Sequence, residues 1–512
     1  MTCSRGPVER ACAPRDLVTD TLDRTRGTPL PVPTDLRGGA LRGEAGKQVA
    51  QSAFACVVAW SADEPQRTGE SLLIRSDGEA SRAYVFGRGT AQTGDEGERI
   101  DLVRVRPGQI QRTPPVSNAW ISRRQLVIRL DPTRGLRVEN VGRCKVLVNG
   151  VATEAARLRP GDTLALKNQL LLYCTERELS SRPSEYPSER APPFGEADAD
   201  GIVGESPAVW HLREQIAFLA ARAGNVLLLG ASGTGKELVA NAIHNLSARR
   251  TKKLLARNAA TFPEGLIDAE LFGNVKDYPN AGMPARPGLI GAADGATLFL
   301  DEIGELPPEL QAHLLRVLDS KGEYQRLGEA FTRTADVRLI AATNRPIDQL
   351  KQDLAARFTL RATLPDLNQR REDIPLLVRH VLHRAAAKDA AIGKRFFQGW
   401  NAERPEPRIE AELMEALIRH AYTTHVRELE SLLWQAVATS PANQLALTDA
   451  VREKLGSSAP ATQNERSGEE LPSRDEIQAC LQRNEGVQER AWRELGLKNR
   501  YVLKRLIKKF GL

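Results

Sequence analysis

The sequence predicts a multidomain protein with three folded parts: an all-β sandwich, an α/β domain built on a parallel sheet, and a small all-α domain. Three observations carry this prediction. Short strands with turn residues between them fill residues 51–176, apolar strands alternate with helical patterns from residue 201, and residues 471–512 have helical apolar spacing. A chain of 512 residues is also too long for one hydrophobic core.

The composition is that of a soluble protein with a mild basic excess. Hydrophobic residues make up 41% of the chain, and 72 Lys and Arg against 65 Asp and Glu give a net charge of +7, which is compatible with nucleic-acid binding. The six cysteines are scattered without a CxxC pair, which argues against a disulfide framework or a zinc site. Because no apolar run reaches the roughly 18 residues of a membrane helix, and no signal-peptide pattern is present, we expect a cytoplasmic protein without a membrane partner.

Polar and proline-rich stretches divide the chain. "SSRPSEYPSERAPPFGEADAD" and "GSSAPATQNERSGEELP" have the composition of linkers, and the first residues lack apolar periodicity. We expect a disordered N-terminus (1–48), an all-β part (49–177), a linker (178–200), an α/β part (201–450), a second linker (451–470) and an all-α part (471–512).

The all-β part has the strand pattern of a sandwich. Segments such as "FACVVAW", "SLLIRS", "RQLVIRL" and "TLALKNQLLLYC" are separated by turn residues. The stretches "VFGRG", "ISRRQ", "VLVNG" and "LRPGDTLAL" resemble a forkhead-associated (FHA) domain. That resemblance implies that loops at one end of the sandwich bind a phosphothreonine protein or peptide.

The FHA resemblance implies a set of phosphopeptide-binding residues, with two departures from the family pattern. Gln125 stands where the family has a loop-bracing histidine, and Cys144 where it has an asparagine that meets the peptide backbone. An arginine together with a hydroxyl suits a phosphate dianion. A retained protein-docking scaffold is the alternative, because a fold does not fix a function. The implied residues are Arg88, Ser122, Arg123 and Asn149.

An apolar run followed by a glycine-rich loop marks a nucleotide site in the α/β part. Val226–Leu229 precedes "GASGTGK", which continues into a helical pattern. Glycines let backbone N–H groups face phosphates, and the lysine neutralises phosphate charge. The predicted ATP-binding residues of this loop are Gly230, Ala231, Ser232, Gly233, Thr234, Gly235, Lys236 and Glu237. The last of these stands where a Ser or Thr normally holds Mg²⁺.

Two further strands end in polar residues that suit the same chemistry. "ATLFLDE" ends in Asp301 and Glu302, and "DVRLIAATN" ends in Asn344. An acidic pair at the end of a strand holds Mg²⁺ and polarises an attacking water. Because ligands gather at the carboxyl edge of open α/β sheets, the three side chains predict a site for ATP and Mg²⁺.

Six motifs carry a second family resemblance. They are "GASGTGKE", "FPEGLIDAELFG", "GATLFLDEIGELPPELQAHLLRVL", "DVRLIAATNRPI", "LNQRREDIPLL" and "HVRELE". They look like the AAA+ P-loop ATPase domain, with its helical lid, of bacterial enhancer-binding proteins, the activators of sigma-54 RNA polymerase. The resemblance covers residues 201–440. A glutamate after the P-loop lysine is a trait of that family, so Glu237 fits it.

The AAA+ resemblance implies a role for each matching residue around the nucleotide. Lys236 would contact phosphate, Asp301 would organise Mg²⁺ and Glu302 would activate water. Asn258 matches the residue that restrains this glutamate, and Asn344 matches the first sensor residue.

Three basic residues are implied to act from the lid or across a subunit boundary. Arg427 of "HVRELE" matches the second sensor on the lid. "LKQDLAARF" stands where the family has "FRxDLYYRL", so Arg357 keeps one arginine-finger position and Lys351 replaces the other. Lysine lacks the planar fork of arginine, so we expect weaker transition-state stabilisation. A finger acts on the neighbouring subunit, which implies a homo-oligomeric ring, a hexamer.

The hexapeptide "DYPNAG" (277–282) stands where the family has "GAFTGA", the loop tip that engages sigma-54. Pro279 and Asn280 replace its Phe and Thr, and Tyr278 offers a displaced aromatic ring. Because proline fixes φ and removes a donor, we interpret the change as loss of ordinary sigma-54 activation. The alternative is a tolerated variant, because loop tips vary freely.

The C-terminal part has the pattern of three short helices, of which the last is basic. "LGLKN" supplies a turn before a helix with basic residues and no acid, the arrangement of a recognition helix in the major groove of DNA. It is similar to the Fis-type helix-turn-helix of enhancer-binding proteins, and a solvated basic face is the alternative. The candidate DNA-binding residues are Lys498, Asn499, Arg500, Lys504 and Arg505.

Together these observations predict an ATP-dependent, DNA-binding transcription regulator with the FHA-like domain as its signal input. The first hypothesis is a motor that remodels sigma-54 RNA polymerase, supported by the P-loop, the acidic pair and the sensors. The alternative is a regulator whose ATPase controls its own assembly and does not act on sigma-54, supported by "DYPNAG". A catalytically silent scaffold is the third hypothesis, which Lys351 would permit.

Overall fold

The computed structural model describes most of residues 51–458. The chain divides into two compact units, Met1–Gly456 and Ser457–Leu512. The predicted helix-turn-helix with its five DNA-binding candidates, and the predicted disordered N-terminus, lie outside the described residues apart from residues 477–478. The described residues are 51–75, 82–90, 97–131, 135–263, 265–319, 322–458 and 477–478.

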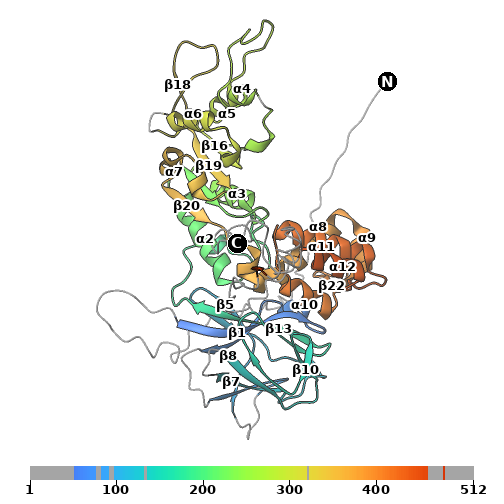
Figure 1. Cartoon of the computed structure of the whole chain (residues 1–512). Coiled ribbons are helices and arrows are strands. Elements are labelled where there is room, and N and C mark those ends of the chain that lie inside the picture. The colour runs from blue at the N-terminus through green and yellow to red at the C-terminus, as the bar shows by residue number, and fades with distance from the viewer. Residues whose placement is uncertain are drawn as a thin grey trace, which may run out of the picture. The chain divides into compact units, whose positions relative to one another are not determined.

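Two β-sheets face each other in the N-terminal region, which confirms the predicted all-β character (Figure 1). The strands are β1 (Gln51–Ser61), β2 (Ser71–Arg75), β3 (Ala83–Phe86), β4 (Glu98–Arg99), β5 (Val103–Arg106), β6 (Gln109–Arg112), β7 (Leu126–Asp131), β8 (Gly135–Asn140), β9 (Val146–Val148), β10 (Val151–Thr153), β11 (Ala155–Leu158), β12 (Thr163–Leu166) and β13 (Leu170–Leu179). One sheet has the order β10-β9-β12-β13-β1-β2-β5-β6 and the other β11-β8-β7-β3-β4. Among the described residues of these two sheets, neighbouring strands are antiparallel, except that β3 and β4 are parallel. Phe54, Cys56 and Val58, which alternate along β1, enter the core between the sheets because successive side chains of a strand lie on opposite faces.

A parallel five-stranded sheet forms the centre of the middle region. Its strands are β14 (Val226–Leu229), β15 (Leu254–Asn258), β16 (Thr297–Asp301), β19 (Arg338–Thr343) and β20 (Leu360–Thr363), in the order β15-β16-β19-β14-β20. A small hairpin of β17 (Glu323–Tyr324) and β18 (Arg333–Thr334) lies outside the sheet. The helices are α2 (Pro207–Ala220), α3 (Lys236–Leu246), α4 (Ile267–Phe272), α5 (Gly288–Ala292), α6 (Pro308–Leu318) and α7 (Gln352–Arg357).

Different helices cover the two faces of this parallel sheet. Val226 and Leu228 belong to a core with α2 and α3, whereas Leu227 between them belongs to a core with α6 and α7. Strands that are buried on both faces read as continuous apolar runs, as β14 and β16 do. The predicted α/β architecture with a parallel sheet is confirmed.

A helical lid follows the sheet, as the AAA+ resemblance implies. It consists of α8 (Ile374–Lys388), α9 (Ala390–Phe396), α10 (Ala411–Arg419), α11 (Val426–Thr439) and α12 (Asp449–Ser458), with a hairpin of β21 (Phe397–Gln398) and β22 (Glu406–Pro407). Val451 of α12 is fully buried in the lid core, so the linker expected from residue 451 starts too early. Val451 and the partly buried Leu455 dock a helix that is otherwise mostly polar, and composition does not reveal this contact. No described helix is long and apolar enough to cross a membrane.

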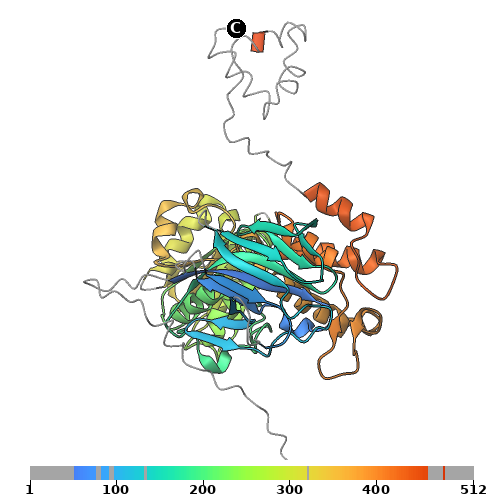
Figure 2. The same cartoon turned by 90° about the horizontal axis from the view of Figure 1, so that it is seen from below.

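The N-terminal sandwich packs directly on the lid. Ala59, Leu171 and Tyr173 of β1 and β13 belong to the same buried core as the lid helices. Trp60 Nε1 donates a hydrogen bond of 2.8 Å to the carbonyl oxygen of Ile409. Figure 1 shows α10 beside β1 and β13, and Figure 2 views the molecule from the sandwich side. The two regions therefore share a hydrophobic interface within one compact unit.

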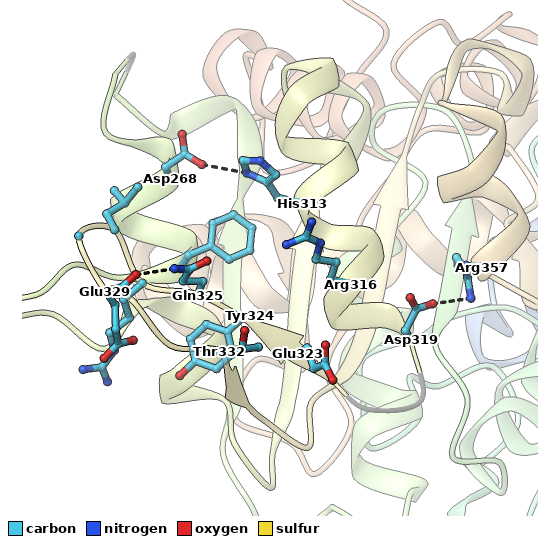
Figure 3. Close-up of a pocket in the computed structure, with 14 residues that line it drawn as sticks. Asp268, His313, Arg316, Asp319, Glu323, Tyr324, Gln325, Glu329, Thr332 and Arg357 are labelled. Atoms are coloured by element: carbon cyan, nitrogen blue, oxygen red, sulfur yellow. Dashed lines mark hydrogen bonds and ion pairs between the residues drawn. The ribbon is translucent and has the colours of Figure 1, made fainter.

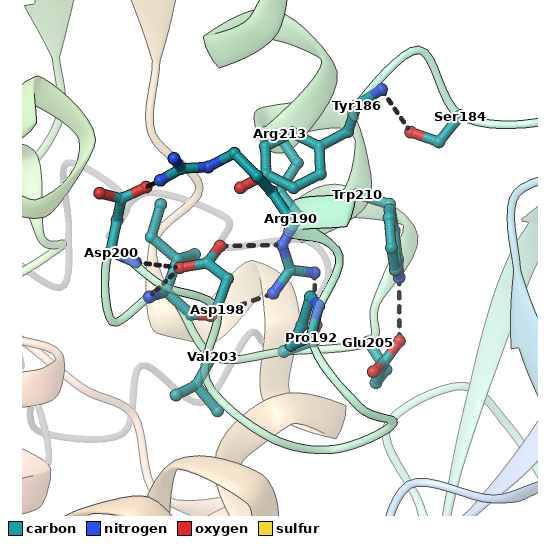
Figure 4. A network of polar contacts seen from close by, with 12 residues as sticks. Ser184, Tyr186, Arg190, Pro192, Asp198, Asp200, Val203, Glu205, Trp210 and Arg213 are labelled. Carbon is teal, nitrogen blue, oxygen red and sulfur yellow. Dashed lines mark hydrogen bonds and ion pairs between the residues drawn. The ribbon is translucent and has the colours of Figure 1, made fainter. Parts of the chain in front are cut away.

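The segment expected as a linker, residues 178–200, is packed against α2 (Figure 4). Asp198 pairs with the fully buried Arg213 of α2, with 3.3 Å between Oδ2 and Nε. Arg190 pairs with Asp200, with 2.7 Å between Nη2 and Oδ2. These contacts fix the entry to the α/β region, so the connection is a structured part of the unit.

Candidate functional site

A glycine-rich loop, residues 230–235, connects β14 to α3. Gly233 and Gly235 have φ values of 81° and 97°, a left-handed backbone that side chains disfavour. A Cβ at residue 233 would lie 2.2 Å from the carbonyl oxygen of Thr424 in the lid. The loop therefore needs glycine both for its path and for the close approach of the lid. Helix α3 begins at Lys236, directly after the loop, so its first N–H groups lie at the loop.

Lys236 is buried at the start of α3 and closes the loop. Its ammonium group donates to the carbonyl oxygens of Gly230, over 2.9 Å, and Ala231, over 3.2 Å. Burial lowers its pKa, while the carboxylates of Glu302 and Asp301 act in the opposite direction. The lysine thus lies within electrostatic reach of the acidic pair, as the sequence predicts for one nucleotide site.

The acidic pair lies at the end of β16. Asp301 Oδ1 accepts a 3.0 Å hydrogen bond from the Glu302 backbone N–H. Glu302 has a φ of 53°, which turns the chain sharply after the strand. Its Oε2 is buried and has no hydrogen-bond partner among the described residues. A buried carboxylate oxygen without a partner is costly unless a cation or water satisfies it, so this atom fits a site for Mg²⁺ and water.

The two predicted asparagines lie at the same edge of the sheet. Asn258 ends β15 in register with Asp301, and its Oδ1 accepts a 2.8 Å hydrogen bond from Ala260 N. Asn344 is exposed and directly follows β19, whose last residue, Thr343, accepts a 3.3 Å hydrogen bond from Gly230 N. The parallel strands therefore bring both asparagines to the edge that carries the P-loop. In this conformation Asn258 caps its own turn.

The lid contacts the P-loop through the start of α11. Arg427 Nη1 donates to Ser232 Oγ over 2.8 Å, and Val426 N donates to Gly233 O over 3.2 Å. Arg427 also acts to lower the pKa of Lys236, because the two cations are close. The predicted second sensor thus lies on the phosphate-binding loop of its own chain.

The predicted finger residues lie apart from this site. Arg357, at the end of α7, pairs with Asp319 and lines a cavity of about 820 Å³ (Figure 3). Arg316 of α6 and Tyr324 of β17 line the same cavity, and no P-loop residue does. Lys351 is exposed just before α7, and its backbone N–H donates to Gln311 Oε1 over 3.3 Å. Of the two predicted finger residues, Arg357 lines this cavity and Lys351 does not.

The 277–282 loop closes on itself. Asp277 Oδ1 accepts a 2.7 Å hydrogen bond from Gly282 N, and Asp277 N donates to Met283 O over 2.9 Å. The fully buried Asn274 donates from Nδ2 to the carbonyl oxygens of Tyr278, over 3.3 Å, and Pro284, over 3.0 Å. The loop is therefore held by hydrogen bonds within itself and to Asn274, and it lacks the Phe and Thr side chains of GAFTGA.

Three loops of the sandwich bring predicted phosphate-contacting residues together. Arg88 N donates to Ser122 O over 3.0 Å, which holds two of the loops side by side. Ser122 Oγ accepts a 2.9 Å hydrogen bond from Arg143 N of the third loop. Arg123 is exposed, and the Arg88 side chain has no hydrogen bond or ion pair among the described residues. Arg88, Ser122 and Arg123 thus form one basic end of the sandwich.

Asn149 has a different set of contacts from these three residues. Its Oδ1 accepts a 3.1 Å hydrogen bond from Thr163 N, and its Nδ2 donates to Asp162 Oδ1 over 2.8 Å. Its carbonyl oxygen accepts a 3.1 Å hydrogen bond from Arg419 of α10. The amide of Asn149 is thus used within the sandwich, and its backbone contacts the lid.

Two residues that brace these loops are not among the predicted phosphopeptide-binding residues. Gln125 is fully buried; its Oε1 accepts from Ser122 N over 3.0 Å and its Nε2 donates to Cys144 O over 2.9 Å, so it braces the loops as the family's histidine is expected to. Arg99 donates to the carbonyl oxygen of Gly89 over 2.6 Å. Arg99 stands in a strand of two residues, where no sequence pattern distinguishes it.

Comparisons with known proteins agree with this geometry. Residues 202–365 match the model of the Sigma-54 interaction domain, and residues 368–468 match the AAA+ ATPase lid domain. The transcriptional regulatory protein ZraR of Salmonella typhimurium is 36% identical over 334 residues, which cover 63% of this chain and 70% of that protein. The Nif-specific regulatory protein of Bradyrhizobium diazoefficiens is 37% identical over 304 residues, 56% of this chain and 49% of that protein. A crystal structure of NtrX from Brucella abortus in complex with ATP has a TM-score of 0.43 and 28% identity, covering 61% of this chain and 69% of that one.

The P-loop, the acidic strand end and the lid arginine, together with the two family models, define a AAA+ ATPase of the sigma-54 activator type. The chain belongs to the family of bacterial enhancer-binding proteins, to which ZraR also belongs.

Proposed function

We propose that this protein hydrolyses ATP at its P-loop and uses the energy to regulate transcription at DNA sites bound by its C-terminal helices, acting on sigma-54 RNA polymerase. The observation that carries the proposal is the convergence on one loop of Lys236, of the Glu302 carboxylate oxygen that has no hydrogen-bond partner in the described part of the chain, and of the lid residue Arg427. A P-loop with an acidic strand end suits phosphoryl transfer to water.

Each residue of the site has a role in this proposal. Lys236 would exchange its two carbonyl contacts for phosphate oxygens when ATP binds, and Asp301 would hold Mg²⁺. A bound Mg²⁺ would supply charge neutralisation at the phosphates. Glu302 would orient and deprotonate the attacking water, and Asn344, which follows the neighbouring strand β19, would act at the same edge of the sheet. Arg427, which contacts the P-loop from the lid, would couple nucleotide binding to the position of the lid.

The finger residue supports a ring of identical subunits. Arg357 lines a cavity that contains no P-loop residue of its own chain, so its guanidinium fits a role at the site of a neighbouring subunit. An ion pair with Asp319 holds the Arg357 guanidinium at this surface. We therefore propose a homo-oligomer, a hexamer, with Arg357 as the finger and Lys351 as a weaker second cation.

The sandwich is proposed as the signal input because it bears on α10 of the lid. Thr163 Oγ1 donates a 2.5 Å hydrogen bond to Glu415 Oε1, and Arg419 Nη1 donates to Asn149 O over 3.1 Å. Both lid residues belong to α10. Any movement of the sandwich therefore displaces α10 unless these contacts break.

A second set of contacts continues from α10 to the P-loop. Tyr422, after α10, exchanges two hydrogen bonds with the side chain of Asn368, of 2.8 Å and 3.0 Å. Four residues later, Val426 donates to Gly233 of the P-loop. These contacts give the sandwich a physical route to the nucleotide site.

The basic end of the sandwich supports a phosphothreonine protein or peptide as the signal. The Arg88 guanidinium has no hydrogen bond or ion pair among the described residues, Ser122 adds a hydroxyl and Arg123 adds charge. Arginine with further donors is the preferred partner of a phosphate dianion. Asn149 is left out of this proposal, because its amide is engaged within the sandwich.

A regulator that does not act on sigma-54 is the second candidate function. The closed, internally braced 277–282 loop favours it, because Pro279 and Asn280 replace the contact residues. In that case ATP turnover controls assembly on DNA.

The test is ATP hydrolysis by the full-length protein, with Lys236→Ala as the control. Turnover well above that of the variant supports the ATPase. Turnover equal to that of the variant refutes it and leaves a scaffold.

A further inference from the structure

Two hairpins lie side by side at one end of the α/β region (Figure 1). The first contains the 277–282 loop and the second connects β17 to β18. Leu327 N donates to Gly273 O over 2.9 Å, and Val275 N donates to Leu327 O over 3.1 Å. Because backbone hydrogen bonds join them, a displacement of the first hairpin moves the second as well.

Tyr278 is a brace between these hairpins. Its ring lies against Gly328, where a Cβ would be 2.6 Å from the ring carbon Cγ. Its carbonyl oxygen accepts from Asn274. Only 42% of Tyr278 is exposed. The displaced aromatic ring of the loop is therefore used within the protein, and it does not replace the phenylalanine of GAFTGA as a free contact.

Phe331 is the most exposed aromatic side chain among the described residues of the two hairpins. It lies between β17 and β18, and 58% of it is exposed. The guanidinium of Arg333 stacks 5.0 Å from its ring centre. Glu329 holds that guanidinium through two hydrogen bonds, of 2.9 Å and 2.8 Å. The ring is thus stacked on a guanidinium that Glu329 holds, while much of the side chain remains in solvent.

We propose that Phe331 makes the apolar contact with sigma-54 that the 277–282 loop no longer supplies. The proposal rests on the proposed sigma-54 function. Three observations carry it: the Sigma-54 interaction model spans both hairpins, the hairpins are bonded into one unit, and Phe331 is the most exposed of their three large aromatic side chains, which are Tyr278, Tyr324 and Phe331. The occupant of this surface is an apolar segment of sigma-54, because a solvent-exposed aromatic ring contributes to binding by burying its face.

Binding of purified sigma-54 to the full-length protein, trapped with ADP and aluminium fluoride, tests the proposal. We expect Phe331→Ala to raise the dissociation constant by at least about tenfold, as truncation of an aromatic anchor does. Phe331→Leu should stay within about threefold of wild type, because it keeps an apolar side chain. The matched control is Phe218→Ala, which removes another exposed phenylalanine stacked by an arginine, here Arg222, which follows α2.

The outcomes separate the contact from the function. Wild-type binding that Phe331→Ala abolishes and Phe218→Ala retains supports the proposal, provided that both variants keep the wild-type melting temperature and ATPase rate. Equal binding by wild type and Phe331→Ala, or equal loss in the Phe218→Ala control, overturns the contact and leaves the sigma-54 function standing. No binding by the wild-type protein overturns both.

Discussion

Arg177 of β13 and Glu372, just before α8, form an ion pair that joins the sandwich to the lid. Their Nε and Oε2 atoms are 2.8 Å apart, and only 3% and 8% of their side chains are exposed. Glu372 is followed by Asp373, which accepts hydrogen bonds from the backbone of Glu205 and Ser206 at the start of α2. One short segment thus connects the sandwich, the lid and the first helix of the ATPase domain.

Arg177→Ala should destabilise the compact unit strongly. The change leaves the Glu372 carboxylate buried without its cation, which costs about 3–5 kcal/mol of unfolding free energy. Urea denaturation of the full-length protein measures it. Arg137→Ala is the control, since it removes an exposed pair of the same sandwich and should cost about 0–1 kcal/mol. Equal effects of the two variants would contradict a buried interface.

The penalty of Arg177→Ala should depend on pH. Burial raises the pKa of Glu372 above its usual 4.5, and Arg177 opposes this shift, so the pKa rises further without the arginine. A raised folded-state pKa gives stability that is present below the unfolded-state value and lost as pH rises. The variant should therefore approach wild-type stability near pH 4.5 and fall behind as pH increases. A penalty that does not change with pH would argue against an ionised Glu372.

Glu302→Gln should separate nucleotide binding from turnover. The glutamine keeps the shape of the side chain but loses the base, so hydrolysis should fall about 10²-fold or more while ATP affinity changes little. Steady-state hydrolysis and binding of a fluorescent ATP analogue measure the two quantities. Lys236→Ala, by contrast, should lose both. Wild-type turnover by Glu302→Gln would remove this residue from the chemistry.

Arg88→Ala should abolish binding of a phosphothreonine peptide by the sandwich. The variant loses the guanidinium of the basic end, and we expect the fold to be little affected, because the Arg88 side chain makes no hydrogen bond or ion pair among the described residues. Calorimetry with phosphorylated and unphosphorylated forms of one peptide library checks this. If the wild-type protein binds both forms equally, the phosphate-recognition proposal fails.

Glu428→Gln should weaken the lid at neutral pH and have less effect in acid. Burial raises the pKa of Glu428, but hydrogen bonds from His420, Thr424 and Thr423 outweigh it and hold the pKa at about 2. A depressed pKa contributes stability that is present above the usual value of 4.5 and lost as pH falls toward 2. The difference in unfolding free energy between wild type and variant should therefore shrink below pH 4.5. A difference that grows in acid would reverse the assigned sign.

The sequence predicts the nucleotide site better than it predicts the contacts between regions. The P-loop, Asp301 and Glu302 follow from local patterns: apolar runs that end in glycine or acid at the edge of one sheet. The sandwich–lid interface depends on tertiary contacts that such patterns do not specify. One signal was present in "FACVVAW", because its continuous apolar run indicates a strand buried on both faces, and β1 indeed packs on the sandwich core and on the lid.

Other residues give no such signal. Arg99 and Asn149 acquire their roles from backbone carbonyls and side chains that the fold brings to them. Tyr278 has the type of a contact residue, and only its position against Gly328 reveals a brace. In each case the residue type suits several roles, and the residues that contact it in the fold determine which role it has.

The most direct test of the account is ATP-dependent open-complex formation by sigma-54 RNA polymerase, on DNA that carries the protein's own binding site. ATP hydrolysis is measured in the same reaction, with Lys236→Ala as the control. The account predicts open complexes that require both ATP and Lys236. Hydrolysis without open complexes would contradict it, and would mean that the ATPase drives a process other than sigma-54 activation.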